Sequence, residues 1–213
     1  MNLIPDLPVL TAFVAASFVL IVTPGPDMTL FLSQTINGGR ARGFAAMFGA
    51  TAGLLLHSML AAFGLSALLV ASATAFTATK VAGAVYLLWL AWQAIRHGTA
   101  LTLAPGAPQR NGLPRVFAMG LGINLLNPKI VMFFLTFLPQ FVSASDPQAA
   151  AKLLFLGLLF TALVPPVCAP MILTAERFTK TIRSSPRLMR TLDWMFAGLM
   201  SAFAARLLLA RGN

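Results

Sequence analysis

Charged residues are scarce in this sequence, where they make up 9% of 213 residues against 58% hydrophobic residues. A soluble domain carries about 25% charged residues. The low charge cannot cover a water-facing surface, so a soluble globular enzyme is excluded. Intrinsic disorder is excluded as well, because disordered chains have low hydrophobicity. The composition therefore indicates an integral membrane protein.

Cysteine and histidine are also scarce. Because Cys168 is the one cysteine, the chain can form neither an internal disulfide nor the thiol pair that a membrane disulfide carrier needs. The histidines, His57 and His97, are too few for a multi-histidine metal site. The sequence shows no nucleophile–base pair, so we expect no enzyme, no metal and no cofactor. We also expect no cleavable signal peptide, since Met1–Leu7 lacks the basic start of one.

Long apolar segments recur along the chain. A helix needs about 20 mostly apolar residues to cross the hydrocarbon core, and the sequence predicts six spans. They are Leu7–Leu32, Phe44–Val70, Val81–Ile95 with a few residues before it, Val116–Phe141, Leu153–Thr174 and Leu192–Leu209. The spans use most of the chain, so we expect one all-α membrane domain over residues 1–213 and no extramembrane domain.

The basic residues are distributed unevenly between the predicted loops. Ten lie in loops one, three and five, and four lie in the remaining loops and termini. Because short cytoplasmic loops carry an excess of Lys and Arg, this distribution places loops one, three and five in the cytoplasm and both termini outside. The net charge of +10 is therefore an orientation signal, and we expect no nucleic-acid partner. Loop five, with five basic residues and Glu176, is expected to contact anionic lipid headgroups.

Two ionisable residues lie well inside apolar segments: Asp27 in the first predicted span and Lys129 in the fourth. A charge near the bilayer centre costs about 3 kcal/mol on insertion scales. Such residues usually face the interior of a helix bundle or a water-filled cavity. We therefore interpret Asp27 and Lys129 as candidates for binding substrate or a proton.

Each of these charges follows a proline that breaks a helix. Pro24 and Pro26 flank Gly25 just before the aspartate, and Asn127-Pro128 directly precedes the lysine. Proline removes a backbone donor and clashes with the preceding turn, and broken backbone at membrane depth is tolerated only inside protein or along a wet cavity. Each following half-helix starts with a proline and presents a partly positive N-terminus, which suits an anionic group.

The two breaks correspond at an offset of 102 residues, close to half the chain. We therefore predict an inverted repeat of three plus three spans, with half-repeats of about residues 1–105 and 106–213 and broken helices one and four. Paired broken helices in two halves are typical of a transporter binding site. In this arrangement Asp27 and Lys129 approach each other, either as an ion pair or with each holding one end of a zwitterion.

Structural readings of the same residues stay open. A proline-broken helix can be a plain kink, Lys129 can extend toward the membrane interface, and an Asp–Lys pair can be a structural link. His57, deep in the second span, can be a proton relay or, more simply, a packing histidine. The glycines of Gly49-x-x-x-Gly53 are typical of close helix packing.

Two motifs then give a family resemblance. The first combines Thr23-Pro24-Gly25-Pro26-Asp27 with Gly39-x-x-x-Gly43, Gly49-x-x-x-Gly53 and His57; the second runs from Asn124-Leu125-Leu126-Asn127-Pro128-Lys129 through Phe133-Phe134 to Phe137-Leu138-Pro139-Gln140-Phe141. These motifs and the six-span layout resemble the LysE/RhtB amino-acid exporters over the whole chain. The resemblance implies a bacterial inner-membrane carrier that exports amino acids or close derivatives by using the proton-motive force.

We therefore predict a secondary transporter with a midplane site formed by Asp27, Lys129, Pro24, Gly25, Pro26, Asn127, Pro128 and His57. Asp27 is expected to hold the ammonium group or the coupling proton. Lys129, Asn127 and the half-helix N-termini are expected to hold the carboxylate. The expected partners are an amino acid, a proton and lipid, and a homo-oligomer is compatible with the sequence. The alternatives are a channel or metal-ion exporter, or a non-transporting scaffold subunit.

Overall fold

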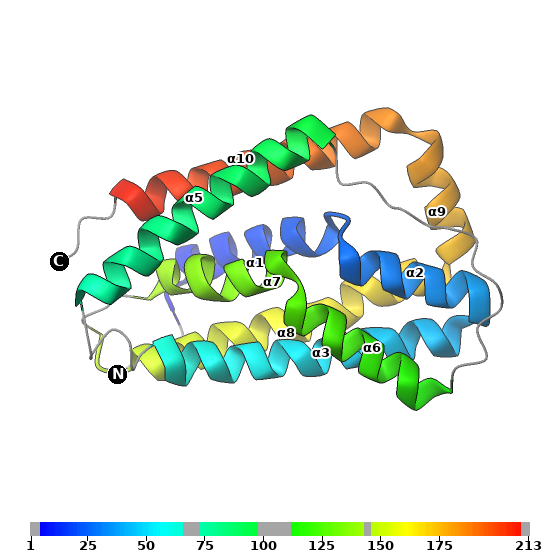
Figure 1. Ribbon diagram of the computed structural model, residues 1–213, viewed down its shortest axis with the longest axis horizontal. Helices are drawn as coiled ribbons and strands as arrows, with labels where there is room; N and C mark the ends of the chain where they lie inside the picture. Colours follow the sequence, from blue (N-terminus) through cyan, green and yellow to red (C-terminus); the bar gives the residue numbers. More distant parts are fainter. Residues whose placement is uncertain (1–4, 66–72, 98–111, 143–145, 210–213) are drawn as a thin grey trace.

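The computed structural model describes residues 5–65, 73–97, 112–142 and 146–209, and every regular element in these ranges is helical (Figure 1). The elements are α1 (Leu7–Val22), α2 (Pro26–Gly38), α3 (Arg40–Leu60), η1 (Ala61–Leu65), α5 (Ala73–His97), α6 (Leu113–Leu126), α7 (Pro128–Met132), η2 (Phe133–Phe137), η3 (Leu138–Phe141), α8 (Ala149–Leu173), α9 (Ala175–Ser184) and α10 (Pro186–Leu209). The prediction of an all-α protein is confirmed for these residues.

Both predicted helix breaks are confirmed. The axes of α1 and α2 bend by 51° between Val22 and Pro26, and α6 bends by 50° against the segment Pro128–Phe141. Gly25 and Asn127, the residues before the two second halves, have extended backbone, and a proline opens the first turn that follows each. The breaks form because proline disfavours helical backbone at the preceding residue and lacks the N–H that would continue the first helix.

Several helices have the length and composition of membrane spans. Arg40–Gly64 and Ala149–Leu173 each qualify alone, and each bent pair qualifies as one broken span, which gives up to four candidates among the described residues. In α5 the apolar part is the shorter segment Val81–Arg96. The chain is therefore a multi-pass membrane protein, and the six-span arrangement stays a prediction.

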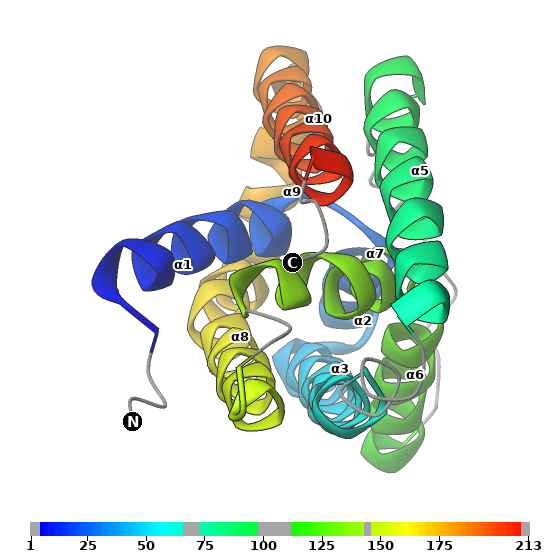
Figure 2. The ribbon, with the colours of Figure 1, turned by 90° about the vertical axis from the view of Figure 1, so that its left-hand side faces the viewer.

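The helices form two groups on either side of the broken segments. Helices α5 and α10 run side by side, while α3, α6 and α8 lie on the opposite side (Figures 1 and 2). The segments α1, α2 and α7 lie between these groups (Figure 2). The two breaks therefore meet in the middle of the bundle, away from both ends.

Helices α3 and α6 cross at very short backbone distance. A Cβ atom built on Gly49 would lie 2.0 Å from the carbonyl oxygen of Phe117, and one on Gly120 would lie 2.1 Å from that of Ala46. Gly53 lies on the same face, where its Cβ would be 2.6 Å from Oδ1 of Asn124. The glycine pattern is therefore a packing pattern, as small residues at membrane helix crossings usually are.

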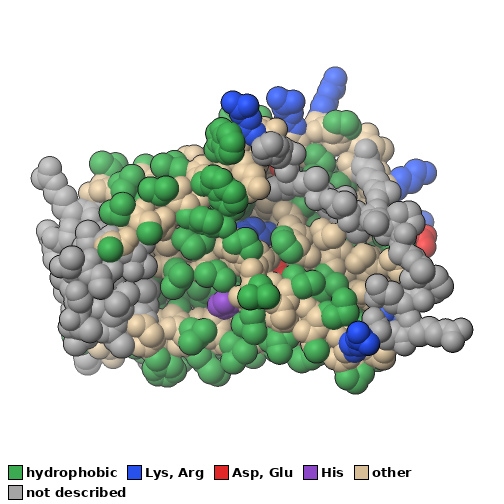
Figure 3. Space-filling model, in the orientation of Figure 1, with side chains coloured by type: hydrophobic (Ala, Val, Ile, Leu, Met, Phe, Trp, Pro, Cys, Tyr) green, Lys and Arg blue, Asp and Glu red, His purple; other side chains and the backbone are tan. Residues whose placement is uncertain are grey.

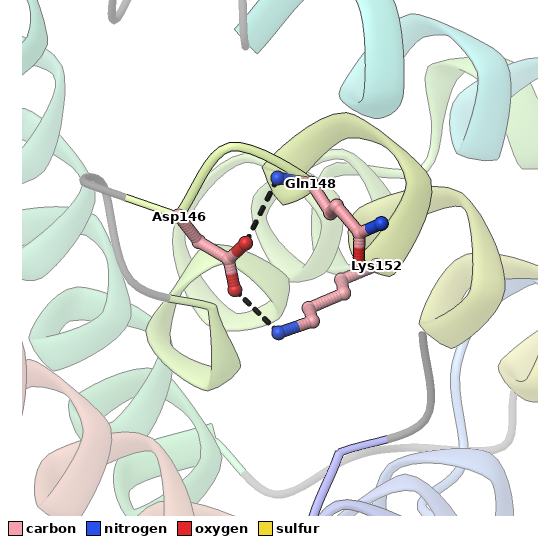
Figure 4. A network of polar contacts seen from close by, with 3 residues as sticks. All are labelled: Asp146, Gln148 and Lys152. Carbon is pink, nitrogen blue, oxygen red and sulfur yellow. Dashed lines mark hydrogen bonds and ion pairs between the residues drawn. The ribbon is translucent and has the colours of Figure 1, made fainter. Parts of the chain in front are cut away.

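The two ends of the bundle differ in charge. The α2–α3 junction, the start of α6 and α9 lie at the right-hand end in Figure 1. In Figure 3 most Lys and Arg side chains in view gather toward this end, and the middle of the face is largely hydrophobic. At the opposite end, Asp146 accepts hydrogen bonds from the backbone N–H of Gln148, at 2.8 Å, and from the ammonium group of Lys152 (Figure 4). These hydrogen bonds stabilise the first turn of α8.

Candidate functional site

Asp27 lies in the first turn of α2, directly after the first break. Its Oδ2 atom accepts one hydrogen bond from Nδ2 of Asn124, at 2.9 Å, and one from Nδ2 of Asn127, at 3.0 Å. Both asparagines belong to the second break: Asn124 is in the last turn of α6 and Asn127 is the residue between α6 and α7. The second broken helix therefore holds the carboxylate of the first.

Lys129 makes the reciprocal connection. It lies in the first turn of α7, and its Nζ atom donates to the carbonyl oxygens of Thr23, at 2.9 Å, and Leu20, at 3.2 Å. Both carbonyls belong to the C-terminal end of α1, where the break leaves carbonyl groups without the usual helical N–H partner. The lysine thus supplies donors to carbonyl groups that the break leaves without a helical N–H partner; for Leu20 that partner would be Pro24, which has no N–H.

Asp27 and Lys129 therefore do not bond directly to each other. Each is held by groups of the opposite broken segment, and the ion pair that the sequence left open is not formed among the described residues. The crossed arrangement links the two halves of the chain by four hydrogen bonds across sequence separations of 97 to 109 residues.

A side-chain cap and a glycine hold the crossed hydrogen bonds in place. The side chain of Asn127 caps α7, since its Oδ1 accepts the backbone N–H of Lys129 at 3.1 Å. With Oδ1 used by the cap and Nδ2 by Asp27, this amide orients both charges. At Gly25, an added Cβ would lie 3.2 Å from Nζ of Lys129, so a residue without a side chain leaves the space that the ammonium group occupies.

A cavity of about 570 Å³ opens beside the two breaks. Six of the eight predicted site residues line it: Pro24, Gly25, Pro26, Asn127, Pro128 and Lys129. Its other lining residues come from α2, α5, α6 and α10: Thr29, Leu30, Ser33, Leu90, Gln93, Ala94, Ile123 and Phe196. The volume lies within the range of small-molecule sites, and the lining is apolar with a few polar groups and one cation.

The other two predicted site residues, Asp27 and His57, do not line this cavity. Asp27 lines a separate chamber of about 40 Å³, which Lys129 also lines. His57 is 8% exposed and stacks on Phe134, with ring centroids 5.4 Å apart. The structure therefore does not bring His57 into the large cavity.

Sequence reasoning missed one residue of this site and several of the cavity. Asn124 was recognised as part of a motif but not as a partner of Asp27. Its signal is a spacing of three residues from Asn127, which places both amides on one side of the helix end. The cavity residues Thr29 and Ser33 lie one turn apart on α2, where they read as ordinary polar positions.

Two broken helices whose breaks meet beside a cavity are typical of secondary transporters, so fold and site together define the class as a membrane transporter. The family model of the LysE type translocators matches residues 18–211. The chain belongs to this family, which confirms the resemblance, and it is therefore a transporter and not an enzyme.

Curated relatives extend over nearly the whole chain. A homoserine/homoserine lactone efflux protein of Salmonella typhimurium is 32% identical over 200 residues, covering 94% of this chain and 96% of the relative. A leucine efflux protein of an Enterobacter species is 26% identical over 199 residues, covering 92% of each. An uncharacterized membrane protein of Vibrio cholerae is 28% identical over 194 residues, covering 91% of this chain and 93% of the relative. No solved structure matches the chain.

Proposed function

We propose that this protein exports amino acids or close derivatives across the bacterial inner membrane by proton antiport, through a site at the two helix breaks. Relatives named for homoserine and leucine efflux support the substrate class. The proposed location of the substrate site rests on the crossed hydrogen bonds of Asp27 and Lys129 beside the large cavity.

The cavity matches an amino-acid carboxylate on one wall. Lys129 supplies a full positive charge, and the N-terminal first turns of α2 and α7 supply partial positive charges at Pro26 and Pro128. Asn127 lines the same wall. These groups can bind a carboxylate together, with Lys129 exchanging its carbonyl partners for the ligand.

The remaining wall favours a neutral side chain. Leu30, Leu90 and Phe196 are apolar, while Ser33 and Gln93 offer hydroxyl and amide groups. None of the lining residues in the described part of the chain is acidic, so a second cationic group on the ligand would have no counter-charge there. We infer that the substrate is a neutral amino acid or a derivative of one.

Asp27 is the group that can couple substrate to protons. Its carboxylate is held by two neutral amide donors rather than by Lys129, so it can accept either an ammonium group or a proton without first breaking an ion pair. If proton and substrate exclude each other at this carboxylate, protons that enter down their gradient exchange for substrate that leaves, which is antiport.

The membrane arrangement is part of the proposal. The nearly equal bends of 51° and 50° and the crossed bonds support two half-repeats of three spans related by inversion. The basic end of the bundle is then cytoplasmic and both termini are periplasmic. Fusion of each terminus to a reporter that is active only in the periplasm tests this orientation. Both fusions should be active, and an inactive fusion at equal abundance contradicts it.

Efflux from loaded cells tests the site. Cells expressing the protein are loaded with homoserine or leucine, and the Asp27→Asn variant is compared with the unaltered chain at equal membrane abundance. We expect export to fall to background, whereas full residual export contradicts the role of Asp27. Saturation and counterflow in the same assay separate a carrier from a channel, and loss of export in the variant argues against a scaffold.

A further inference from the structure

The site contains two separate spaces, and one side chain lines both. The large cavity of about 570 Å³ and the small chamber of about 40 Å³ share a single lining residue among those the structure describes, Lys129. On the cavity side of the lysine are Gly25 and Asn127, and on the chamber side are Asp27 and Asn124. The lysine side chain therefore borders both spaces.

Two polar side chains that line the chamber have acceptor atoms without a partner. Oδ1 of Asp27 and Oδ1 of Asn124 are buried and have no hydrogen-bond partner in the described part of the chain. Buried polar atoms are rarely left unpaired without a reason. Both are acceptors, so the missing partner is a donor, such as an ammonium group or water.

The chamber is too small for a whole amino acid. A volume of about 40 Å³ has room for a few water-sized groups, since one water needs about 10–15 Å³ measured in this way. The rest of its lining is apolar, with Phe31, Phe160 and Val164 among its walls. A chamber of this size and chemistry fits the amine end of a ligand.

We propose that the small chamber is an occluded subsite for the ligand's amine group and that Lys129 is the gate between it and the large cavity. This inference rests on the proposed export function. A carboxylate that arrives in the cavity draws Nζ away from the carbonyls of Leu20 and Thr23, and the space vacated admits the ammonium group to Asp27.

The chain carries a natural reporter for this gate. Cys168 is the only cysteine of the sequence, it is 3% exposed, and it lines the chamber but not the cavity. Reaction of its thiol with methylmercury, a thiol reagent much smaller than an amino acid, therefore measures access to the chamber. The Cys168→Ser variant shows the background.

The gate is tested by the labelling rate of purified protein in detergent. We expect Lys129→Ala to label about tenfold faster or more, because each hydrogen bond to a charged group is worth about this factor in a rate. Lys152→Ala, at the opposite end of the helix that carries Cys168, is the matched control and should label at the original rate. An unchanged rate in folded Lys129→Ala protein overturns the gate.

A second variant tests the gate if Lys129→Ala does not fold. Gly25→Ala keeps the lysine but places a Cβ 3.2 Å from its Nζ atom, so the ammonium group must shift by a few tenths of an ångström and its hydrogen bonds to Leu20 and Thr23 weaken. Faster labelling of Cys168 in Gly25→Ala supports the gate, and an unchanged rate overturns it.

The amine subsite has its own test. In whichever variant has the open gate, methylammonium chloride should slow the labelling of Cys168, and adding Asp27→Asn should remove that protection. Tetramethylammonium, which has no N–H donor, is the control and should not protect. No protection by methylammonium, or equal protection after Asp27→Asn, overturns the subsite. Because these labelling arms require no transport, a protein that passes them but exports no amino acid contradicts the proposed function alone.

Discussion

The close crossing of α3 and α6 positions the site. Substitution of two glycines in α6, one inside the crossing and one outside it, tests how close the helices are. Gly120 lies in the crossing, where a Cβ would be 2.1 Å from the carbonyl oxygen of Ala46, whereas a Cβ on Gly122 would meet nothing within 4 Å. Both residues are inside the same helix, so the two substitutions Gly120→Ala and Gly122→Ala share the intrinsic helix gain of about 0.5–1 kcal/mol.

The expected difference follows from the distance. A carbon–oxygen contact needs at least 3 Å, so Gly120→Ala must push the helices apart by about 1 Å, and overpacking of this kind costs about 1–3 kcal/mol. Gly122→Ala should be neutral or slightly stabilising. For a chain of this size about 1 kcal/mol shifts Tm by about 2–4 °C, so the Tm of Gly120→Ala should fall by several degrees.

Thermal unfolding in detergent, followed by tryptophan fluorescence, measures both variants side by side. The displaced helix carries Asn124, so export should also fall in Gly120→Ala and not in Gly122→Ala. Equal Tm values for the two variants would refute the close crossing and, with it, the placement of Asn124 beside Asp27.

Three further predictions concern the side chains of Lys129, His57 and Asp146. Lys129→Met should abolish export at unchanged membrane abundance, because a neutral side chain cannot bind the carboxylate, while Lys152→Met should export normally. His57→Phe should retain most export, because the ring stacks on Phe134 outside the cavity, and a complete loss would favour a proton relay. The hydrogen bond from Lys152, followed by that from the backbone of Gln148, lowers the pKa of Asp146 below its ordinary value of 3.8. Its stabilisation is therefore present above that value and lost as pH falls through the lowered pKa, so Asp146→Asn should reduce the acid dependence of Tm, and an identical dependence would contradict this.

The helix breaks could be predicted because their cause is local. Pro26 and Pro128 act on the residues directly beside them, and a charge follows each proline in the sequence. The same local reasoning placed Gly25 and Asn127 at the breaks. It could not show which groups bind the two charges, because those partners are about 100 residues away in the chain.

Apolar composition located the spans less accurately at their ends. The third predicted span, Val81–Ile95 with a few residues before it, covers the apolar part of α5, and the helix already begins at Ala73. The fifth predicted loop is largely helical, since α9 covers Ala175–Ser184 and α10 begins at Pro186. Helices continue through polar residues wherever backbone bonds and one packed face support them, and a hydropathy criterion does not detect those turns.

The crossed site shows what sequence symmetry can and cannot reveal. The offset between the breaks indicated that Asp27 and Lys129 belong to one site. The sequence left open a direct ion pair or a zwitterion held between the two charges. In the structure, carbonyl groups at the end of α1 bind Lys129, and the amides of Asn124 and Asn127 bind Asp27. Backbone carbonyl groups that lack a hydrogen-bond partner at a helix end bind a cation strongly. These carbonyl groups compete with the carboxylate for the lysine, and a comparison of charged residues alone does not reveal them.

Counterflow in proteoliposomes tests the central claim most directly. Vesicles loaded with unlabelled homoserine or leucine take up a trace of the same labelled amino acid, for the unaltered protein, Asp27→Asn, Lys129→Ala and the control Lys152→Ala. The account predicts saturable counterflow of at least one of these amino acids in the unaltered and control proteins and none in the two site variants. Equal counterflow in all four proteins would contradict a site at the crossed helix breaks.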